Sequence, residues 1–195
     1  MPLPPEFFAR SVHEVAPELI GVTLLVDGVG GRIVEVEAYD QDDPASHSHD
    51  GRTSRNAAMF GPPGRAYVYR SYGIHWLLNV VCGEEGHGAA VLVRAVIPEH
   101  GRERIAARRP GVGERDWCRG PGRLGVALGV GPQHDGARLD AEPFTLRAAC
   151  GPVAVLATPR IGISRAVERP WRFVEAGSVY ASDTRVRAGG ATSSG

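Results

Sequence analysis

Residues 66–81 read AYVYRSYGIHWLLNVV, and this stretch carries the clearest structural signal of the chain. Two runs of aromatic and branched apolar side chains flank Gly73, a pattern typical of two strands joined by a tight turn. We therefore predict a β-hairpin with arms at residues 66–72 and 74–82. Because hairpin arms pair antiparallel, consecutive strands of this kind need no crossover helix between them.

The pattern extends outward in both directions. Further strands are predicted at residues 23–26, 32–39, 89–97, 144–149 and 153–157, with a turn at 27–31 and an irregular segment at 158–174. Helices are predicted from the capping box of Ser11 and Glu14 to about Ile20, from Pro98 to about Arg108, and at residues 123–128, with a helical turn at 55–59. Hairpin-linked strands with helices at the ends predict the α+β class rather than a doubly wound parallel sheet.

The length of 195 residues is sufficient for one hydrophobic core, so residues 1–184 are expected to form a single domain and residues 185–195 a loose tail. No apolar run reaches the length of a membrane span, and the first residues lack the pattern of a secretory signal. Cys82, Cys118 and Cys150 are odd in number and widely spaced, which fits neither a disulfide framework nor a zinc motif. These features predict a cytoplasmic protein that does not bind a membrane.

Charge is unevenly distributed although the formal net charge is zero. Seven arginines and three acids lie between residues 102 and 123, and four arginines and one acid lie between residues 158 and 173. A basic face is compatible with a polyanionic partner, and a solvated surface of mixed charge explains the counts equally well. All 22 basic side chains are arginine, so no lysine amine can form a Schiff base with a substrate sugar.

The strand at residues 32–39, RIVEVEAY, places two carboxylates on one face. Alternate residues of a strand share a face, so Glu35, Glu37 and Tyr39 lie opposite an apolar face. The solvent side of an ordinary antiparallel strand is the more common explanation of such a pattern. The other explanation is a site in which these carboxylates take part in acid–base chemistry.

Four large aromatic side chains lie within ten residues of the hairpin: Tyr67, Tyr69, Tyr72 and Trp76. Cross-strand pairs that stabilise a hairpin explain such a group, and so does a stacking platform for a flat ligand. For Tyr67 we favour the packing role. Tyr72 lies beside Gly73 at the tip, where core packing is least available, so we favour a projecting wedge there.

Two polar residues interrupt otherwise apolar strands. Asn79 lies within LLNVV and Arg94 within VLVRAV. An unpaired buried charge is very costly, so Arg94 requires a partner. A carboxylate such as that of Glu37, or a phosphate of a ligand, would serve.

The loop at residues 40–52 contains His47, His49 and four aspartates. Clusters of imidazoles and carboxylates can hold divalent metals. The spacing here matches neither two ligands on one helix nor an EF-hand loop. We therefore expect no metal at this loop and assign His47 to contact with a flat ligand.

Five stretches in this order resemble the alkyladenine (3-methyladenine) DNA glycosylase family. They are RIVEVEAY (32–39), ASHSHDGRTSRNAAMFGPPGRAYVYRSYGIHWLLNVV (45–81), GHGAAVLVRAVIP (86–98), CRGPGRLGVALGV (118–130) and TPRIGISRAVERPWRFV (158–174). Each motif alone is weak. Their common order and spacing over residues 6 to 180 make the resemblance specific.

The resemblance implies a fold and an activity. The fold would be a single mixed domain with a curved, largely antiparallel sheet, peripheral helices and a protruding β-hairpin, similar to the barrel of a formyltransferase C-terminal domain. The activity would be that of a monofunctional DNA glycosylase of base excision repair. Such an enzyme flips alkylated or deaminated purines (3-methyladenine, 7-methylguanine, hypoxanthine, ethenoadenine), hydrolyses the N-glycosidic bond and leaves an abasic site. The family implies a monomer without a cofactor, whose partner is double-stranded DNA containing damaged purines.

The family's motifs also imply roles for individual residues. By resemblance, Glu37 of EAY is the general base and Arg94 lies near the catalytic water. The rings of Tyr39, His47 and Tyr69 would enclose the flipped base.

The remaining roles concern the pocket floor and the DNA. By resemblance, Asn79 is the floor residue that screens purines, and Tyr72 of SYG fills the gap left in the duplex. Arg52 and Arg55 of GRTSRN would contact the DNA backbone.

The sequence departs from the family in the loop after Tyr39, which is shorter and more acidic than in vertebrate relatives. That departure bears on the placement of His47 and on the substrate range. Three alternatives stay open. They are a non-catalytic module that binds DNA lesions, a sugar hydrolase using Glu35 with Glu37, and a metal-dependent hydrolase using His47, His49, Asp40 and Asp43.

Overall fold

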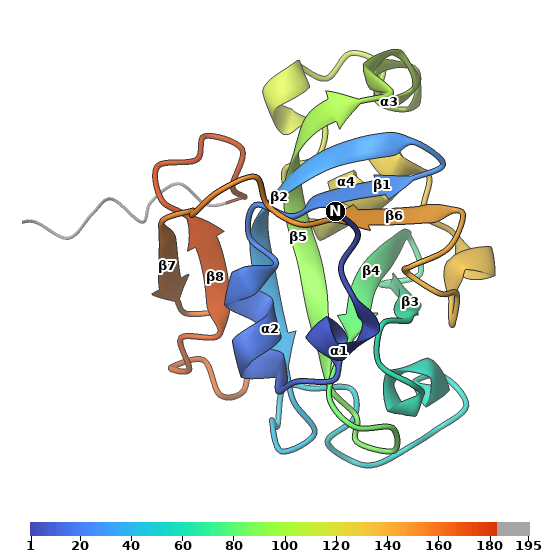
Figure 1. The fold of residues 1–195 in the computed structure, drawn as a ribbon, viewed down its shortest axis with the longest axis vertical. Coiled ribbons are helices and arrows are strands. Elements are labelled where there is room, and N and C mark those ends of the chain that lie inside the picture. Colours follow the sequence, from blue (N-terminus) through green and yellow to red (C-terminus); the bar gives the residue numbers. More distant parts are fainter. Residues whose placement is uncertain (183–195) are drawn as a thin grey trace, which may run out of the picture.

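The computed structural model describes residues 1–182, which form one curled antiparallel sheet with short helices around it (Figure 1). The strands are β1 (Thr23–Val26), β2 (Val29–Tyr39), β3 (Ala66–Ser71), β4 (His75–Val81), β5 (Ala90–His100), β6 (Phe144–Arg147), β7 (Val155–Thr158) and β8 (Arg172–Glu175). The helices are α1 (Pro5–Phe8), α2 (Val12–Glu18), α3 (Arg102–Arg108) and α4 (Pro121–Leu128), with 3₁₀ turns η1 (Ala57–Phe60), η2 (Glu114–Asp116) and η3 (Pro132–His134). The predicted α+β class is confirmed, and the sheet curls into a half-barrel. The predicted tail at residues 185–195 lies outside the described residues.

Strand β2 is the centre of the sheet. Strand β5 pairs with one edge of β2 along most of its length, while β1 and β8 share the other edge. Because β2 has neighbours on both edges and is covered on both faces, the side chains of Glu35 and Glu37 are 0% exposed. The solvent-face interpretation of these two carboxylates is therefore wrong.

Strands β3 and β4 form the predicted hairpin. Its tip is a turn in which the N–H of Ile74 donates to the carbonyl of Ser71 at 2.9 Å. Tyr72 and Gly73 occupy the centre with φ values of 49° and 68°. Positive φ at both central positions is the pattern of type I′ hairpin turns. Glycine adopts it freely, whereas a tyrosine rarely does.

The boundary predicted at Pro98 is wrong. Strand β5 continues through Pro98 to His100, and α3 begins only at Arg102. Pro98 lies opposite Gly31 at an irregularity of the β2–β5 ladder. Prolines are tolerated at such bulges because the missing N–H interrupts no regular pair.

Three other local predictions needed correction. The turn before β2 is shorter, because Asp27 and Gly28 form it with φ values of 50° and 71° and pairing resumes at Val29. Helix α2 ends at Glu18, and Ser11 caps it by accepting from the N–H of His13 rather than through a capping box. Strand β8 begins within the segment predicted to be irregular, at Arg172, and pairing with β2 and β7 stabilises it.

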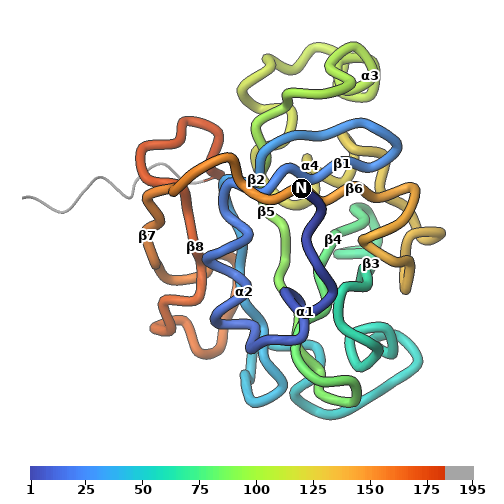
Figure 2. The backbone as a smooth tube through the Cα atoms, in the orientation of Figure 1, coloured from blue at the N-terminus to red at the C-terminus, as the bar shows by residue number. Residues whose placement is uncertain are grey.

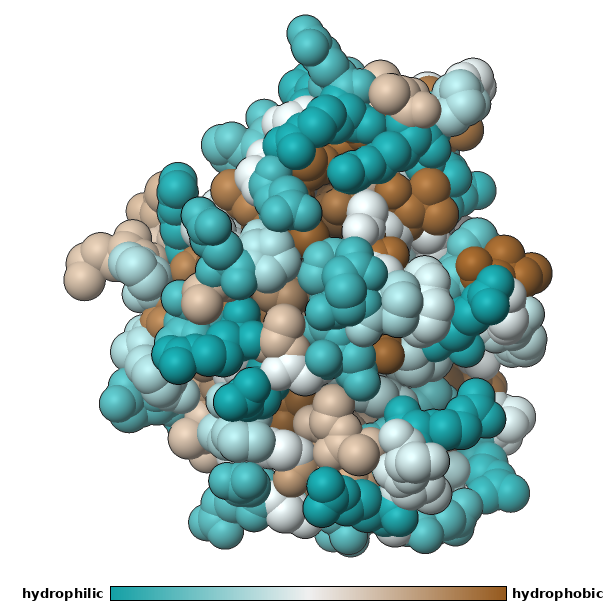
Figure 3. Space-filling view, turned by 90° about the vertical axis from the view of Figure 1, so that its right-hand side faces the viewer, coloured by the Kyte–Doolittle hydropathy of each residue, from teal (hydrophilic) through white to brown (hydrophobic). Residues whose placement is uncertain are grey.

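The main hydrophobic core lies against the sheet. Helix α2 packs on β2, and α4 packs on β4 and β5. Figure 2 shows α2 in front of β2, with β7 and β8 beside it. The face drawn in Figure 3 is mostly hydrophilic, and its larger hydrophobic area is partly covered by hydrophilic side chains. Within residues 1–182, no helix is long and apolar enough to cross a membrane.

Candidate active site

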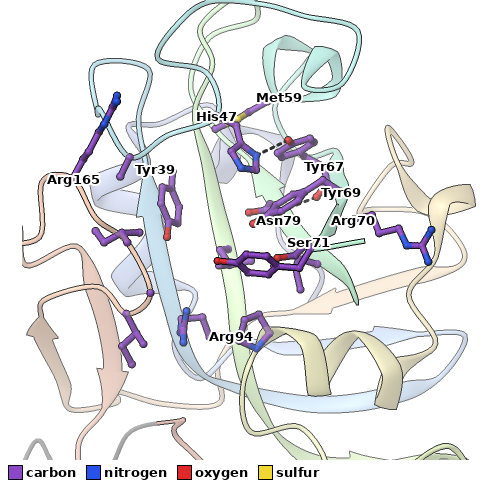
Figure 4. A pocket seen from close by; sticks show the side chains of 18 of the residues that line it. Tyr39, His47, Met59, Tyr67, Tyr69, Arg70, Ser71, Asn79, Arg94 and Arg165 are labelled. Atoms are coloured by element: carbon purple, nitrogen blue, oxygen red, sulfur yellow. Dashed lines mark hydrogen bonds between the residues drawn. The ribbon is translucent and has the colours of Figure 1, made fainter. Parts of the chain in front are cut away.

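A cavity of about 710 Å³ lies beside the hairpin, at the end of β2. This volume is within the roughly 300–1,000 Å³ typical of small-ligand pockets. In Figure 4, Tyr39 stands on one side and the rings of His47 and Tyr67 on the other, with Arg94 below them in the view. Seven of the residues predicted from the sequence line this cavity: Tyr39, His47, Arg55, Tyr69, Tyr72, Asn79 and Arg94.

One row of side chains crosses the sheet beneath the cavity. Asn79 pairs with Tyr67 on one side and with Leu92 on the other, and Leu92 pairs with Glu37. Directly paired residues of antiparallel strands project from the same face. Residues from four strands are thereby aligned, with Glu37 on the central strand.

Arg94 reaches this row because β5 bulges. The register of β5 against β2 shifts beside Glu35, which leaves Arg94 as the extra residue. A bulge of this kind redirects a side chain. Nε of Arg94 donates to Glu35 at 2.8 Å, and Nη1 donates to Glu37 at 3.0 Å. Both carboxylates therefore supply the partner that the sequence required for Arg94.

The carboxylate of Glu37 is fully buried and held by three donors. Oε2 accepts from the phenol of Tyr39 at 2.9 Å and from Arg94, and Oε1 accepts from the N–H of Ile161 at 2.8 Å. Tyr39, Arg94 and Ile161 line the cavity and Glu37 lies behind them. A carboxylate has about four acceptor positions. One position on Oε1 is thus left by the contacts within residues 1–182.

Glu35 is enclosed more completely. Oε1 accepts from Arg94 and Arg172, each at 2.8 Å, and from the hydroxyl of Ser182 at 2.6 Å, while Oε2 accepts from the Ser182 N–H at 2.5 Å. Burial acts to raise the pKa of Glu35, but the two arginines and Ser182 outweigh it and hold this pKa below its usual value. Glu35 is therefore a fixed anion that anchors Arg94. A sugar hydrolase would need one carboxyl of the pair to be protonated, and this environment opposes that for Glu35.

Aromatic rings form the walls of the cavity. Tyr69 stacks on Tyr67 with ring centroids 5.4 Å apart, and His47 meets Tyr69 edge-on at 4.5 Å. Nδ1 of His47 is 3.0 Å from the phenol of Tyr67. Tyr67 therefore packs as predicted, but it also lines the cavity, a role that sequence reasoning did not assign to it.

Burial keeps these walls uncharged. It raises the pKa of Tyr69 to about 12, and burial together with Glu37 also raises the pKa of Tyr39. Burial and the nearby Arg55 lower the pKa of His47 below its usual value. Near pH 7 the phenols are protonated and the imidazole is neutral, so the walls present only ring faces and edges.

The acidic loop does not gather its side chains into a metal site. Asp40 bonds to His87 at 2.6 Å, Asp43 pairs with Arg160, and His47 turns toward the hairpin. In the part of the chain that the structure describes, no group of three or more His, Cys, Asp and Glu side chains is arranged to hold a metal. The alternative of a metal-dependent hydrolase at this loop loses its structural support.

Three exposed arginines, which we call the rim arginines, line the cavity: Arg55, Arg70 and Arg165. Arg55 was a predicted DNA contact, and the other two were missed. Arg52, the other predicted contact, does not line the cavity. Within residues 1–182, none of the rim arginines forms an ion pair with a carboxylate.

Sequence reasoning also missed the segment that follows β7. Ile161 contributes a backbone N–H to Glu37, and Arg160 lies behind Tyr39. The available signal was the stretch TPRIGIS, which matched the family without an assigned role. A backbone donor has no residue signature, so the sequence could not reveal it.

Comparisons of the sequence with known proteins identify its family. The profile of the family described as "Methylpurine-DNA glycosylase (MPG)" matches residues 6–179. A relative from Rhodopseudomonas palustris (strain HaA2), provisionally named a 3-methyladenine DNA glycosylase, is 59% identical over 181 residues, covering 93% of this chain and 90% of its own. Relatives with the same provisional name from Granulibacter bethesdensis and Nitrosospira multiformis are 55% and 56% identical, covering 94% and 90% of this chain and 88% and 91% of their own. The chain belongs to the methylpurine-DNA glycosylase family, DNA repair hydrolases that act on N-glycosidic bonds.

Proposed function

We propose that the protein excises alkylated and deaminated purines from double-stranded DNA and leaves an abasic site. Its substrates would be 3-methyladenine, 7-methylguanine, hypoxanthine and ethenoadenine. One observation carries the proposal: Arg94 lines a ring-walled cavity beside an exposed hairpin tip, and Glu37 lies behind it in hydrogen-bond contact. We also propose that it acts as a monomer in the cytoplasm, which size-exclusion chromatography and cell fractionation would test.

The cavity would accept the base only after extrusion from the duplex. Extrusion costs a few kcal/mol, and less for a base that is already poorly paired or stacked. Stacking on aromatic rings returns about 1–3 kcal/mol per base. Tyr39 on one side and Tyr69 with His47 on the other would supply these rings. Asn79, fixed by its bond to the Tyr67 carbonyl at 3.0 Å, would screen purines at the floor.

Tyr72 would fill the space that the base leaves. Its side chain is 94% exposed, and its φ of 49° is unfavourable for a bulky residue. Neither feature stabilises the free protein, so a role in contact with DNA accounts for both. Arg55, which lines the cavity with Tyr72, and Arg52 would bind backbone phosphates.

Glu37 would act on water. The remaining acceptor position on its Oε1 would take a proton from the attacking water, with Arg94 orienting that water. The same anion would stabilise the positive charge that develops on the sugar as the bond breaks. Water would be the nucleophile. Since the chain has no lysine, strand cleavage through a lysine Schiff base does not follow.

The test is one incubation with duplexes that each carry a single lesion, with and without a chelator. We expect free base in both conditions, with strands that break only after alkali. Binding to lesion DNA without base release would indicate the non-catalytic module, and loss of activity with chelator would indicate a metal enzyme. The proposal would be refuted if none of the four bases were released.

A further inference from the structure

We propose that Arg160 is a positioning and specificity-determining residue, which supports the Tyr39 wall from behind and shifts the preference between cationic and neutral bases. This inference rests on the proposed function. The guanidinium carbon of Arg160 lies 4.7 Å from the centroid of the Tyr39 ring. Tyr39 lines the cavity and Arg160, which is buried, does not. The cation therefore occupies the face of the ring turned away from the cavity.

Arg160 is held firmly in this place. Both its Nη atoms bond to the carboxylate of Asp43, with Nη2 at 3.0 Å from Oδ1, and neither side chain is exposed. Nη1 also donates to the carbonyl of Ala38 at 2.9 Å. Among residues 1–182 its Nε has no hydrogen-bond partner, and the centroid of the Trp171 ring lies 5.2 Å from the guanidinium carbon. A buried donor without a partner is costly. We infer that the contacts of the guanidinium with the two ring faces offset this cost.

The same segment also holds the general base. Arg160 binds the backbone next to Tyr39, and the following residue, Ile161, donates its N–H to Glu37. Two successive residues thus connect the cavity wall and the catalytic carboxylate to one loop. Loosening Arg160 should disturb both, which makes it a positioning residue for base binding and for the chemistry.

Its charge adds a second effect. An aromatic face attracts cations through its quadrupole. A cation already present on one face of Tyr39 weakens that attraction for a cationic base on the other face. Asp43 neutralises the pair as a whole, but the guanidinium is the member in contact with the ring. We infer that Arg160 lowers the preference of the pocket for cationic bases and so improves the relative excision of neutral ones.

Arg169 provides a matched control. Its guanidinium carbon lies 4.5 Å from the centroid of the Trp171 ring, and its Nη1 is 3.8 Å from Asp43. It is therefore another arginine that contacts an aromatic ring near the same aspartate. No contact joins it to Tyr39 within residues 1–182.

The experiment compares a cationic lesion, 7-methylguanine, with a neutral one, hypoxanthine, in otherwise identical duplexes. Single-turnover rates and dissociation constants are measured for the wild type, Asp43→Asn/Arg160→Met, Arg160→Lys and Arg169→Met. We expect the double variant to lose about tenfold in rate on both lesions. Its ratio of specificity for 7-methylguanine over hypoxanthine should rise about threefold to tenfold. Arg160→Lys, which keeps the charge, and Arg169→Met should keep the wild-type ratio within about twofold.

An unchanged ratio in a folded double variant, checked by circular dichroism, would overturn the inference. So would a changed ratio in Arg160→Lys. Where the double variant does not fold, Asp43→Asn/Arg160→Gln, which removes both charges but keeps polar side chains, takes its place, with the same expected rise in the ratio. If the wild type releases only 7-methylguanine, the ratio is taken from dissociation constants measured in a Glu37→Gln background. A wild type that releases neither base defeats the proposed function itself, whereas release of both with an invariant ratio defeats only this inference.

Discussion

Two regions of the molecule use arginine in opposite ways. Six of the seven arginines between residues 102 and 123 donate to groups of the protein itself: Arg102 to Glu114, Arg104 to Asp27, Arg108 to Ala127, Arg115 to Val179, Arg119 to Ala181, and Arg123 to Asp116. The rim arginines are scattered in the sequence but line one cavity, and within residues 1–182 they have no carboxylate partner.

The difference teaches that the density of cations along a sequence does not measure the positive charge available to a ligand. Three of these six arginines form ion pairs, which largely cancel their own field at a distance, and the other three keep their charge but donate to backbone carbonyls of the protein. An exposed arginine with neither kind of bond has its donors free for a phosphate. We therefore expect function to be concentrated at the cavity end. The 102–123 segment should act as structure.

The largest expected difference between the two regions is in base release after replacement of a carboxylate, Glu37 at the cavity or Glu114 in the 102–123 segment. Glu37→Gln should lower single-turnover base release by about 10²- to 10⁴-fold, because the amide cannot accept the proton from water. Binding of lesion DNA should remain. Glu114→Gln, which alters a carboxylate that pairs with Arg102, should leave the rate unchanged. Nearly full activity in Glu37→Gln would remove the distinction.

The next effect concerns exposed apolar side chains. Tyr72→Ala should weaken binding of lesion duplexes by about 5- to 100-fold, because about 1–3 kcal/mol of stacking is lost. Val179→Ala, at a 53% exposed position beside Arg115, should have no effect on binding. Tyr72→Gly should bind as poorly as the alanine variant and raise the free energy of unfolding by about 1 kcal/mol, because the positive φ is relieved. Equal affinities in fluorescence titrations of all variants would contradict the wedge.

A smaller effect tests the arginines directly. Arg165→Ala should reduce the slope of log affinity against log salt by about 0.9, the value for one phosphate contact. Arg102→Ala should leave the slope unchanged and cause at most a small loss of stability, since the exposed pair with Glu114 contributes little. Titrations at several salt concentrations measure both. If Arg102→Ala lowered the slope as much as Arg165→Ala, the 102–123 segment would be a DNA contact after all.

The smallest effect is a pH dependence of stability from two histidines, His47 in the cavity and the buried His134 outside it. Burial lowers the pKa of His47 and of His134, whose Nδ1 accepts from the N–H of Gly131 at 3.0 Å. A lowered pKa means that folding favours the neutral form. This contribution is complete above the unfolded pKa of about 6.5 and decreases as the pH falls below it. The melting temperature should therefore fall between pH 7.5 and 5.5, and His134→Asn should reduce that fall without affecting lesion binding. An identical fall in the variant would exclude burial of His134 as a cause.

Much of the fold followed from local patterns. The β3–β4 hairpin was predicted because Gly73 and the flanking aromatic runs act over a few residues. The end of β5 and the whole of β8 were missed. Both depend on pairing with β2, where a bulge accepts Pro98 and a central strand stabilises a short neighbour.

The candidate site also has features that local patterns predicted and features that they did not. Strand alternation placed Glu35, Glu37 and Tyr39 together, and the need of Arg94 for a partner was correctly anticipated. The resemblance to a known family supplied roles that the alternation could not. Neither pointed to Ile161, because its contribution is a backbone N–H that any residue but proline has.

By itself the sequence determined which side chains share a strand face, where the hairpin turns, and that no lysine side chain can take part in the chemistry. Only the tertiary structure decided that Glu37 lies beneath the cavity, bonded to Arg94 at a separation of 57 residues and to Ile161 at 124. The reason is physical. Alternation and turn geometry are set by neighbouring residues, whereas register and bulges between distant strands depend on the burial achieved by the whole sheet.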